Sequence, residues 1–248
     1  DIMRNGRAFA PDATIHGVVV QEMVAGGVEV LLGLARHEPF GLGMVVGVGG
    51  ALVAVALALV MGVAIGLVAG FAGGWVDTVL MRLVDVMLSF PYLLLAIAIV
   101  ATLGTGVQNT TLAVGIWATP SFARITRGQV LNIKGREYIT AAEAVGVSGW
   151  RMVWRYILPN AIPPVIVFAT LYMANAILLE AALSFLGLGV QPPQPSWGLM
   201  VASGRDFLRV APHVATIPGV AIMLAVLGFN LLGDGLHDAL DPRLRGQV

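Results

Sequence analysis

Thirty consecutive residues, 41–70, carry no charged side chain. An α-helix rises 1.5 Å per residue, so about 20 apolar residues suffice to cross a hydrocarbon core of about 30 Å. The run therefore predicts a membrane-spanning helix. Small residues allow helices to approach closely in lipid, and this run contains many of them. They include Gly47, Gly49, Gly50, Ala54, Ala56, Ala58, Gly62 and Gly66.

The composition of the whole chain agrees with a membrane protein. Of its 248 residues, 58% are hydrophobic and only 11% are charged, which is too little charge to cover a soluble protein of this length. The formal net charge is zero, so the composition does not suggest a nucleic-acid partner. Because the chain has no cysteine, it has no disulfide, thiolate nucleophile or cysteine-ligated metal.

Four further apolar runs follow the first and predict four more spans. Pro91 lies inside the first of these runs, where the missing N–H predicts a kink. Residues 71–85 indicate a surface turn and the start of a helix, and residues 181–209 are rich enough in Gly and Pro to predict an irregular external loop. The four predicted spans are residues 86–103, 107–123, 156–179 and 210–232.

The N-terminal residues 1–40 are harder to assign. Glu22 and Glu29 interrupt an otherwise apolar stretch, and a carboxylate near the middle of a bilayer costs roughly 2.5–3.5 kcal/mol. These two residues favour an external or interfacial segment over a span. Since the chain starts without Met or a cleavable signal pattern, we expect it to begin partway into a longer gene product.

The largest cluster of basic residues, six of the 14 Lys and Arg side chains, lies between the third and fourth predicted spans. Lys and Arg beside membrane spans are retained in the cytoplasm, so we expect residues 124–155, and by parity the C-terminus, to be cytoplasmic. Residues 138–145 predict a short helix that ends at Gly146, and Ser148 can cap a second one. Such a compact knob suits docking better than catalysis. The basic residues are Arg124, Arg127, Lys134, Arg136, Arg151 and Arg155.

The knob resembles the loop of ATP-binding-cassette (ABC) importer permeases that carries Glu-Ala-Ala, three residues, Gly, nine residues and Ile-x-Leu-Pro. Residues 141–142, Gly146 and residues 158–159 match this pattern, while Thr140 and Tyr156 replace its Glu and its first Ile. Three further blocks resemble the second permease subunit of dipeptide, oligopeptide and nickel importers. These blocks are GGWVDTVLMRLVDVMLSFP, LSFLGLGVQPPQPSWG and FNLLGDGLHDALDPRLR.

The resemblance implies an all-α membrane protein with a type I ABC importer transmembrane domain. It covers residues 41–245, includes a coupling loop at 134–159, and leaves residues 1–40 as a separate N-terminal segment. The family usually has six spans, and we expect about five here. The resemblance further implies that six residues of the knob couple the membrane helices to an ATPase. These residues are Thr140, Ala141, Ala142, Glu143, Ala144 and Gly146.

The expected partners follow from the same resemblance. They are the lipid bilayer of the bacterial cytoplasmic membrane, a homologous permease forming a heterodimer, two ATP-binding subunits and an external substrate-binding protein. ATP and Mg are expected in the ATP-binding subunits, because this chain has no GxxxxGK[ST] loop. The resemblance favours peptides as substrate, with nickel or a metal chelate as the alternative.

Glu180 is an acidic residue directly after the fourth predicted span, and an ionisable group within a membrane segment is a candidate functional residue. It lies eighteen residues after Ile162, about 27 Å along a helix, which places it near the outer interface. Two roles remain open for it: bonding to neighbouring backbone, or lining the transport path. A secondary transporter or channel would be a different class, but it predicts paired charges within the bundle or an inverted repeat, and the sequence shows neither.

We expect no catalytic or metal site in this chain. The four histidines lack metal-ligand spacing, and no serine forms a recognisable pattern with a histidine and an acid. The histidines are His16, His37, His213 and His237.

Overall fold

The computed structural model describes residues 34–37, 41–44, 49–192 and 194–240. Glu22 and Glu29, and the tail beyond residue 240, lie outside these ranges. Strands β1 (Leu34–His37) and β2 (Gly41–Met44) pair antiparallel, with Leu34 opposite Met44. This hairpin crosses the boundary expected at residue 40, and it adds two short strands to a chain that we predicted to be entirely helical.

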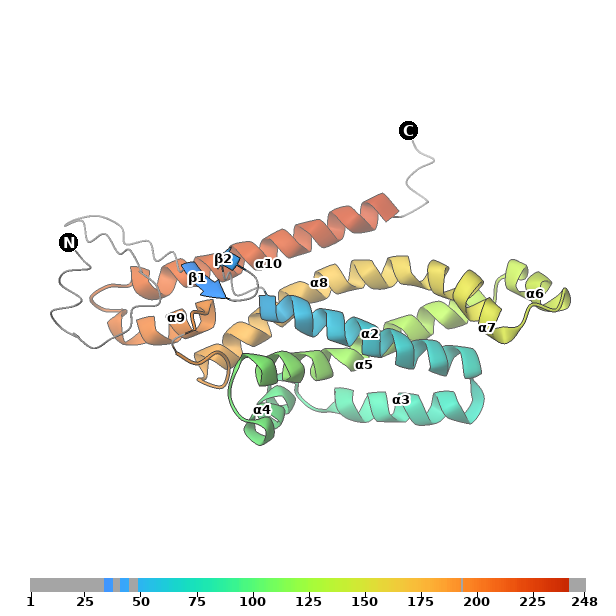
Figure 1. The fold of residues 1–248 in the computed structure, drawn as a ribbon, viewed down its shortest axis with the longest axis horizontal. Helices are drawn as coiled ribbons and strands as arrows, with labels where there is room; N and C mark the ends of the chain where they lie inside the picture. The colour runs from blue at the N-terminus through green and yellow to red at the C-terminus, as the bar shows by residue number, and fades with distance from the viewer. Residues whose placement is uncertain (1–33, 38–40, 45–48, 193, 241–248) are drawn as a thin grey trace.

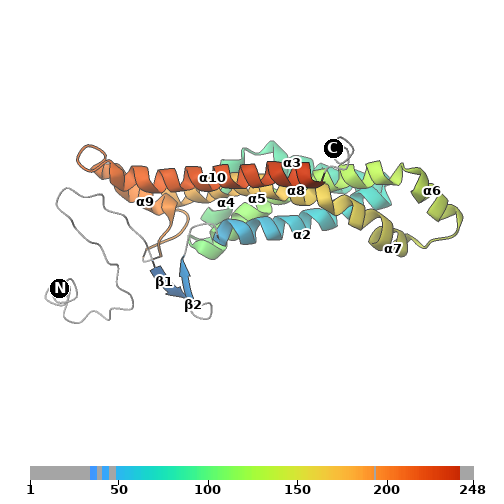
Figure 2. The same cartoon turned by 90° about the horizontal axis from the view of Figure 1, so that it is seen from above.

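Four long helices run along the length of the molecule (Figures 1 and 2). Helices α2, α5 and α10 run toward the end that carries helix α6 (Glu137–Ala144), whereas α8 and the shorter helix α3 (Gly74–Ser89) run the opposite way (Figure 1). With α3 included, successive long helices in the described ranges run along this axis in alternating directions (Figure 1). The long helices are α2 (Gly49–Ala72), α5 (Val107–Lys134), α8 (Leu158–Phe185) and α10 (His213–Leu240).

Three helices in the described ranges are long and apolar enough to cross a membrane, or four if one bent pair counts as a span. The three are Gly50–Ala72, Gly149–Phe185 and His213–Leu240. Helix α5 has 28 residues, the same length as α10, but polar side chains along its whole length keep it out of this group. The predicted total of five spans therefore includes one helix that is less apolar than the rest.

The predicted second span, residues 86–103, is wrong as a single helix. The chain forms α3 (Gly74–Ser89) and α4 (Tyr92–Leu103), which are bent by 94° relative to each other. Phe90 has extended geometry, with φ −83° and ψ 137°, because Pro91 disfavours the helical region for the residue before it. Helix α3 includes most of residues 71–85, which we expected to be a surface turn followed by the start of a helix; the helix begins earlier, at Gly74.

Several other predicted boundaries also need correction. Helix α5 continues through Arg124 and Arg127 to Lys134, so these residues belong to a helix and not to a loop. Helix α8 extends to Phe185, and a further helix, α9 (Trp197–Gly204), lies within the expected irregular loop. It is followed by the short 3-10 turn η2 (Arg205–Phe207) and by α10, which extends beyond the predicted end at residue 232.

The described helices enclose two buried apolar clusters. The larger lies where α2, α4, α5 and α8 meet and contains Phe122, whose ring contacts those of Phe168 and Tyr172. The smaller lies at the end of the bundle beside α6. The first cluster holds the helices together, and the second fixes the knob to them.

Candidate functional site

Helix α6 (Glu137–Ala144) forms the outer part of the predicted knob. It contains the good helix formers Glu and Ala, and Glu137 in its first turn complements the positive end of the helix dipole. The helix ends in a Schellman motif: the N–H of Gly146 donates to Glu143 O at 2.9 Å and that of Val147 donates to Ala142 O at 3.1 Å. Gly146 has φ +80°, which confirms the predicted left-handed glycine.

The second half of the knob is not a separate helix. Helix α7 (Gly149–Met152) continues through a π-helical turn, η1 (Val153–Ile157), directly into α8. Together they form one helix of 37 residues, Gly149–Phe185. Ser148 occupies the predicted N-cap position, but its side chain makes no capping hydrogen bond within the described part of the chain. The knob is therefore joined to a membrane helix without a break.

One face of α6 packs against the ends of the membrane helices. Ile139 is buried, and Ala142 is only 7% exposed. They belong to the smaller cluster, with Val130 and Ile133 of α5, Met152 of α7, Ile157 of η1 and Ala161 of α8. Of the small residues that we expected to face a partner, Ala142 therefore faces inward.

The opposite face of α6 points away from the bundle. Thr140, Ala141, Glu143, Ala144 and Gly146 are all exposed. Large apolar side chains lie exposed beside them, Val145 at 82% and Trp150 at 74%, together with Tyr138 and Trp154. We call Tyr138, Thr140, Ala141, Glu143, Ala144, Val145 and Trp150 the outer face of the knob.

Sequence reasoning missed Tyr138, Val145 and Trp150 as members of this face. A Val and a Trp that flank a Gly-Val-Ser-Gly turn were a usable signal, because an irregular turn offers little room to bury them. Exposed large apolar side chains beside a helix end are typical of a protein-interaction surface.

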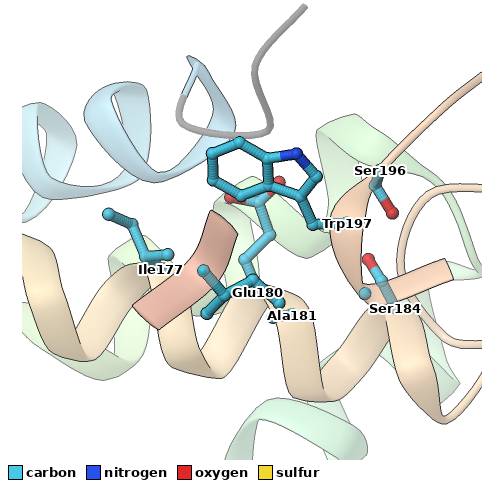
Figure 3. Close-up of a pocket in the computed structure, with 8 residues that line it drawn as sticks. Ile177, Glu180, Ala181, Ser184, Ser196 and Trp197 are labelled. Carbon is cyan, nitrogen blue, oxygen red and sulfur yellow. The ribbon is translucent and has the colours of Figure 1, made fainter. Parts of the chain in front are cut away.

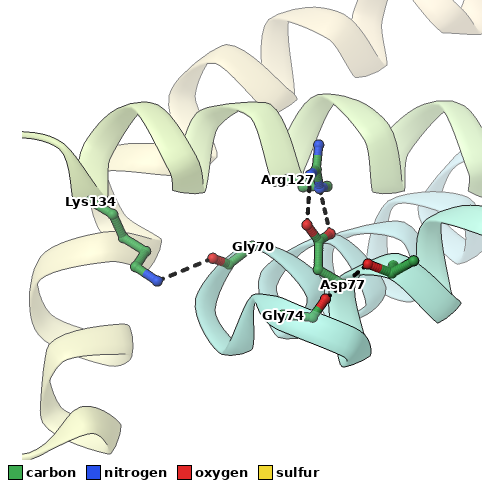
Figure 4. Close-up of polar contacts among 6 residues, drawn as sticks. Gly70, Gly74, Asp77, Arg127 and Lys134 are labelled. Carbon is green, nitrogen blue, oxygen red and sulfur yellow. Dashed lines mark hydrogen bonds and ion pairs between the residues drawn. The ribbon is translucent and has the colours of Figure 1, made fainter.

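Basic residues at the base of the knob join α5 to the neighbouring helices. Lys134 Nζ donates to Phe71 O at 2.9 Å and to Gly70 O at 3.4 Å, and it lies 5.4 Å from the centre of the Phe71 ring. It thereby satisfies carbonyl groups at the C-terminal end of α2. Figure 4 shows this contact beside a bidentate ion pair between Arg127 and Asp77 of α3.

Glu180 lies where α8 meets the start of α2 and α9 (Figure 3). Its carboxylate accepts a hydrogen bond from the backbone N–H of Ala51, in the first turn of α2, where the helix dipole favours a negative group. A Cβ added to Gly50 would lie 2.9 Å from Glu180 Oε1, so the glycine leaves room for the carboxylate. This contact ties α8 to α2, and a role in the transport path stays a prediction.

A small cavity of about 10 Å³ adjoins Glu180 and is lined by Ser184, Ser196 and Trp197 (Figure 3). Glu180 Oε2 has no hydrogen-bond partner among the described residues. The cavity has room for no more than one water molecule. Within the same ranges, no three His, Cys, Asp or Glu side chains lie close enough to hold a metal ion.

Residues 62–246 match the sequence profile of the family described as binding-protein-dependent transport system inner membrane component. Because this range covers most of the chain, the chain belongs to that family of inner-membrane transport components. A second profile, of an ATP-grasp domain, matches residues 1–64. The described part of that range is the hairpin and the first part of the apolar helix α2, and we assign no function to this match.

Two relatives are permease subunits of transport systems. The chain is 44% identical over 204 residues to the glutathione transport system permease protein GsiD of Pectobacterium atrosepticum, covering 82% of this chain and 68% of the relative. It is 47% identical over 192 residues to the dipeptide transport system permease protein DppC of Alkalihalophilus pseudofirmus, covering 77% and 63%. The chain thus spans about two thirds of their length. These relatives confirm the predicted resemblance.

Two solved structures share the fold. The MetNI methionine ABC transporter in an inward-facing conformation matches with a TM-score of 0.62, covering 78% of this chain and 92% of that chain at 19% identity. An amino acid ABC transporter matches with a TM-score of 0.57, covering 78% and 90% at 18% identity. The expected fold class, the helical membrane domain of a type I ABC importer, is confirmed.

Proposed function

We propose that this chain is the permease subunit of an ABC importer that carries di- and oligopeptides across the bacterial cytoplasmic membrane. The family match over residues 62–246 carries the proposal. Two relatives named as glutathione and dipeptide permeases support the substrate class, because glutathione is itself a short peptide. In this proposal the chain pairs with a homologous permease, receives substrate from an external binding protein, and leaves ATP and Mg to two ATPase subunits.

The knob is the proposed coupling element. Its outer face supplies small and apolar side chains suited to a groove on an ATPase subunit. Its inner face, through Ile139 and Ala142, holds it rigidly against the bundle. Since α7 continues into α8 as one helix of 37 residues, a push on the knob moves α8. When the ATPase subunits bind ATP and close, they would thereby switch the permease pair between its inward-facing and outward-facing states.

The proposed orientation places the knob and the C-terminal end of α10 in the cytoplasm. Both lie toward the same end of the molecule, opposite to α9 (Figure 1). Lys134, Arg136, Arg151 and Arg155 lie at the knob end, whereas Arg205 and Arg209 lie at the other end. This excess of positive charge supports a cytoplasmic knob.

Cysteine labelling tests the orientation, because the chain has no native cysteine. In intact cells carrying the assembled transporter, a membrane-impermeant thiol reagent should label exposed Ser203→Cys of α9 and leave Ser148→Cys unlabelled. Ser148→Cys should become reactive only after the membrane is permeabilised. The reverse pattern would overturn the orientation.

Reconstitution tests the substrate. The chain with its partner permease, ATPases and binding protein in lipid vesicles should take up labelled dipeptide only when ATP is supplied. The purified chain alone should not hydrolyse ATP, because ATP is bound by the ATPase subunits. ATP-driven uptake of a nickel chelate without peptide uptake would contradict the peptide assignment, and uptake without any ATPase subunit would contradict the class.

Two neighbouring alanines test the coupling role. Ala141 is exposed, so Ala141→Asp should leave the chain folded but place a charge in the docking groove, weakening ATPase co-purification and peptide uptake together. Ala142 is buried, so Ala142→Asp should instead destabilise the chain itself, by several kcal/mol. Normal ATPase binding by the folded Ala141→Asp variant would show that the outer face does not dock.

A further inference from the structure

The exposed faces of the long helices differ in chemistry. Along α2 and along residues 220–232 of α10 the exposed large side chains are apolar, among them Val60, Val68, Met223 and Leu227, and they suit contact with lipid. Helix α5 exposes a different strip along one face, because its members recur every three or four residues. This strip consists of Trp117, Ser121, Arg124 and Gly128, which are exposed or half-buried.

The strip contains an ion pair that is open to its surroundings. Arg124 lies 2.6 Å from Asp85 of α3, and the two side chains are 57% and 48% exposed. Arg124 precedes Lys134 by ten residues, about 15 Å along α5, and Asp85 follows Gly74 by eleven residues, about 16 Å along α3. Helix α5 has 28 residues, and a hydrocarbon core of about 30 Å placed anywhere along it includes Arg124, so the ion pair lies within the depth of the membrane.

Lipid is a poor environment for such a pair. Charged side chains within the membrane face the interior of a bundle or a water-filled cavity, because exposure to hydrocarbon costs several kcal/mol. Arginine can extend toward the headgroups, but the short side chain of Asp85 cannot. The surface that carries Arg124 and Asp85 therefore does not face lipid, and faces either water or a partner protein.

The polar surface continues on both sides of the ion pair. On α3, Arg82 lies one turn before Asp85 and is exposed without an ionic partner among the described residues. On α5, the hydroxyl groups of Ser121 and Tyr172 of α8 lie 3.4 Å apart. Val79 and Val86 are exposed apolar residues of α3 that lie three and four residues from Arg82, on the same face. Arg82 therefore lies at the edge between the apolar surface of α3 and Asp85.

We propose that Trp117, Ser121, Arg124 and Gly128 of α5, with Arg82 and Asp85 of α3, line the water-filled path through which the substrate moves. Arg124 and Asp85 offer charges of both signs, which suits a zwitterionic solute such as a peptide with a free amino group and a free carboxylate. This inference rests on the proposed function, and it names the surface that performs it.

A pair of glycines gives a matched test. A Cβ added to Gly128 of α5 or to Gly228 of α10 would meet no described atom within 4 Å, so a side chain added at either position begins in open space. Gly128→Trp should lower ATP-driven dipeptide uptake about tenfold or more by narrowing the path, with the partner permease and ATPases still bound. Gly228→Trp, facing lipid, should keep uptake within about twofold of the parent. Equal uptake by the two assembled variants would overturn the inference.

Water access provides the second measurement. A charged methanethiosulfonate reacts with a thiolate, which needs water to form. In the assembled transporter, Ser121→Cys should therefore react about ten times faster or more than Met223→Cys on the exposed face of α10. An unreactive Ser121→Cys, or one that forms a disulfide with a cysteine placed in the partner permease, would show a dry protein interface and overturn the inference.

The two measurements also separate this inference from the proposed substrate. A transporter that imports peptides while Ser121→Cys is unreactive would contradict the path and leave the function standing. Fast reaction at Ser121→Cys in a transporter that imports no peptide would support the path and contradict the substrate class.

Discussion

Helices α2 and α10 are both long and apolar, with 24 and 28 residues, yet they pack in opposite ways. In the most apolar stretch of α2, 33% of the residues are buried inside the chain, against 11% in α10. Gly62, Gly66 and Gly70 of α2 lie directly against α5. On α10, added side chains at Gly219 and Gly228 would meet no described atom within 4 Å.

The comparison shows what holds a membrane helix in place. Lipid tails are as apolar as Leu, so apolarity alone does not draw two helices together, and close backbone packing has to do so. Three glycines spaced four apart place three gaps on one face of α2, and α5 fills them. Helix α10 packs against α8 and α9 but leaves most of its surface open to lipid or to a partner. We therefore expect α2 and α5 to move as one body.

The largest expected effect comes from filling one of these gaps. Gly66→Leu would drive a side chain into Ala123 O and Thr126 Cβ of α5, which are backbone and branched atoms that cannot move aside. We expect a loss of about 3 kcal/mol or more in the unfolding free energy of the detergent-purified chain. Gly228→Leu is the control, with an expected change of less than about 0.5 kcal/mol. Similar losses for both variants would remove the distinction between the two helices.

A smaller substitution, glycine to alanine, tests the same comparison at two buried glycines, one in α2 and one in α10. At Gly62 an added Cβ meets Phe122 Cβ and the backbone of Ala123 and Thr119. At Gly233 of α10 it meets chiefly the flexible side chain of Leu171, with Thr170 Oγ1 at 3.0 Å. Gly62→Ala should therefore cost about 2 kcal/mol. Gly233→Ala should cost less than about 1 kcal/mol, because Leu171 can change rotamer. Thermal unfolding of both variants measures the difference, and an equal cost would contradict it.

Much of this arrangement could be predicted from the sequence. The uncharged run 41–70 identified α2, and its residues Gly62 and Gly66 were correctly expected to allow close packing. Gly146 was predicted to adopt a left-handed conformation because it follows the good helix formers of residues 138–145, where the helix ends. These predictions succeeded because each depends on local spacing or on a single backbone angle.

The predictions that failed depend on contacts between distant segments. Arg124 and Arg127 suggested that the third span ended before them, but their charges are balanced by Asp85 and Asp77 of α3, so the helix continues. The predicted partner-facing role of Ala142 depended on which side of α6 meets the bundle. A single sequence does not reveal that side, because Ala141, Ala142 and Ala144 are equally small.

The ion pair between Asp77 of α3 and Arg127 of α5 should contribute less to the stability of the chain than the glycine contacts of α2. Asp77 accepts two hydrogen bonds from Arg127, and these side chains are 16% and 33% exposed. Asp77→Asn keeps one acceptor but removes the charge, so we expect a loss of about 1 kcal/mol. Asp206→Asn removes the partner of Arg205 in a pair whose side chains are both largely exposed, and its effect should be near zero. If both variants lost equal stability, α3 would not be held to α5 by this pair.

The smallest expected effect on stability comes from Thr126, whose hydroxyl group is buried in the contact between α2 and α5. Thr126 packs against Gly66 and is fully buried, and its Oγ1 has no hydrogen-bond partner among the described residues. A buried hydroxyl without a partner costs free energy, so Thr126→Val should leave stability unchanged or raise it by up to about 1 kcal/mol. Thr119→Val on the same helix is the control, because Thr119 Oγ1 donates to Gly115 O at 2.8 Å and its loss should cost about 1 kcal/mol. If Thr126→Val lost as much stability as Thr119→Val, Thr126 would have a polar partner in the contact between α2 and α5. The two helices would then be joined by more than close backbone packing.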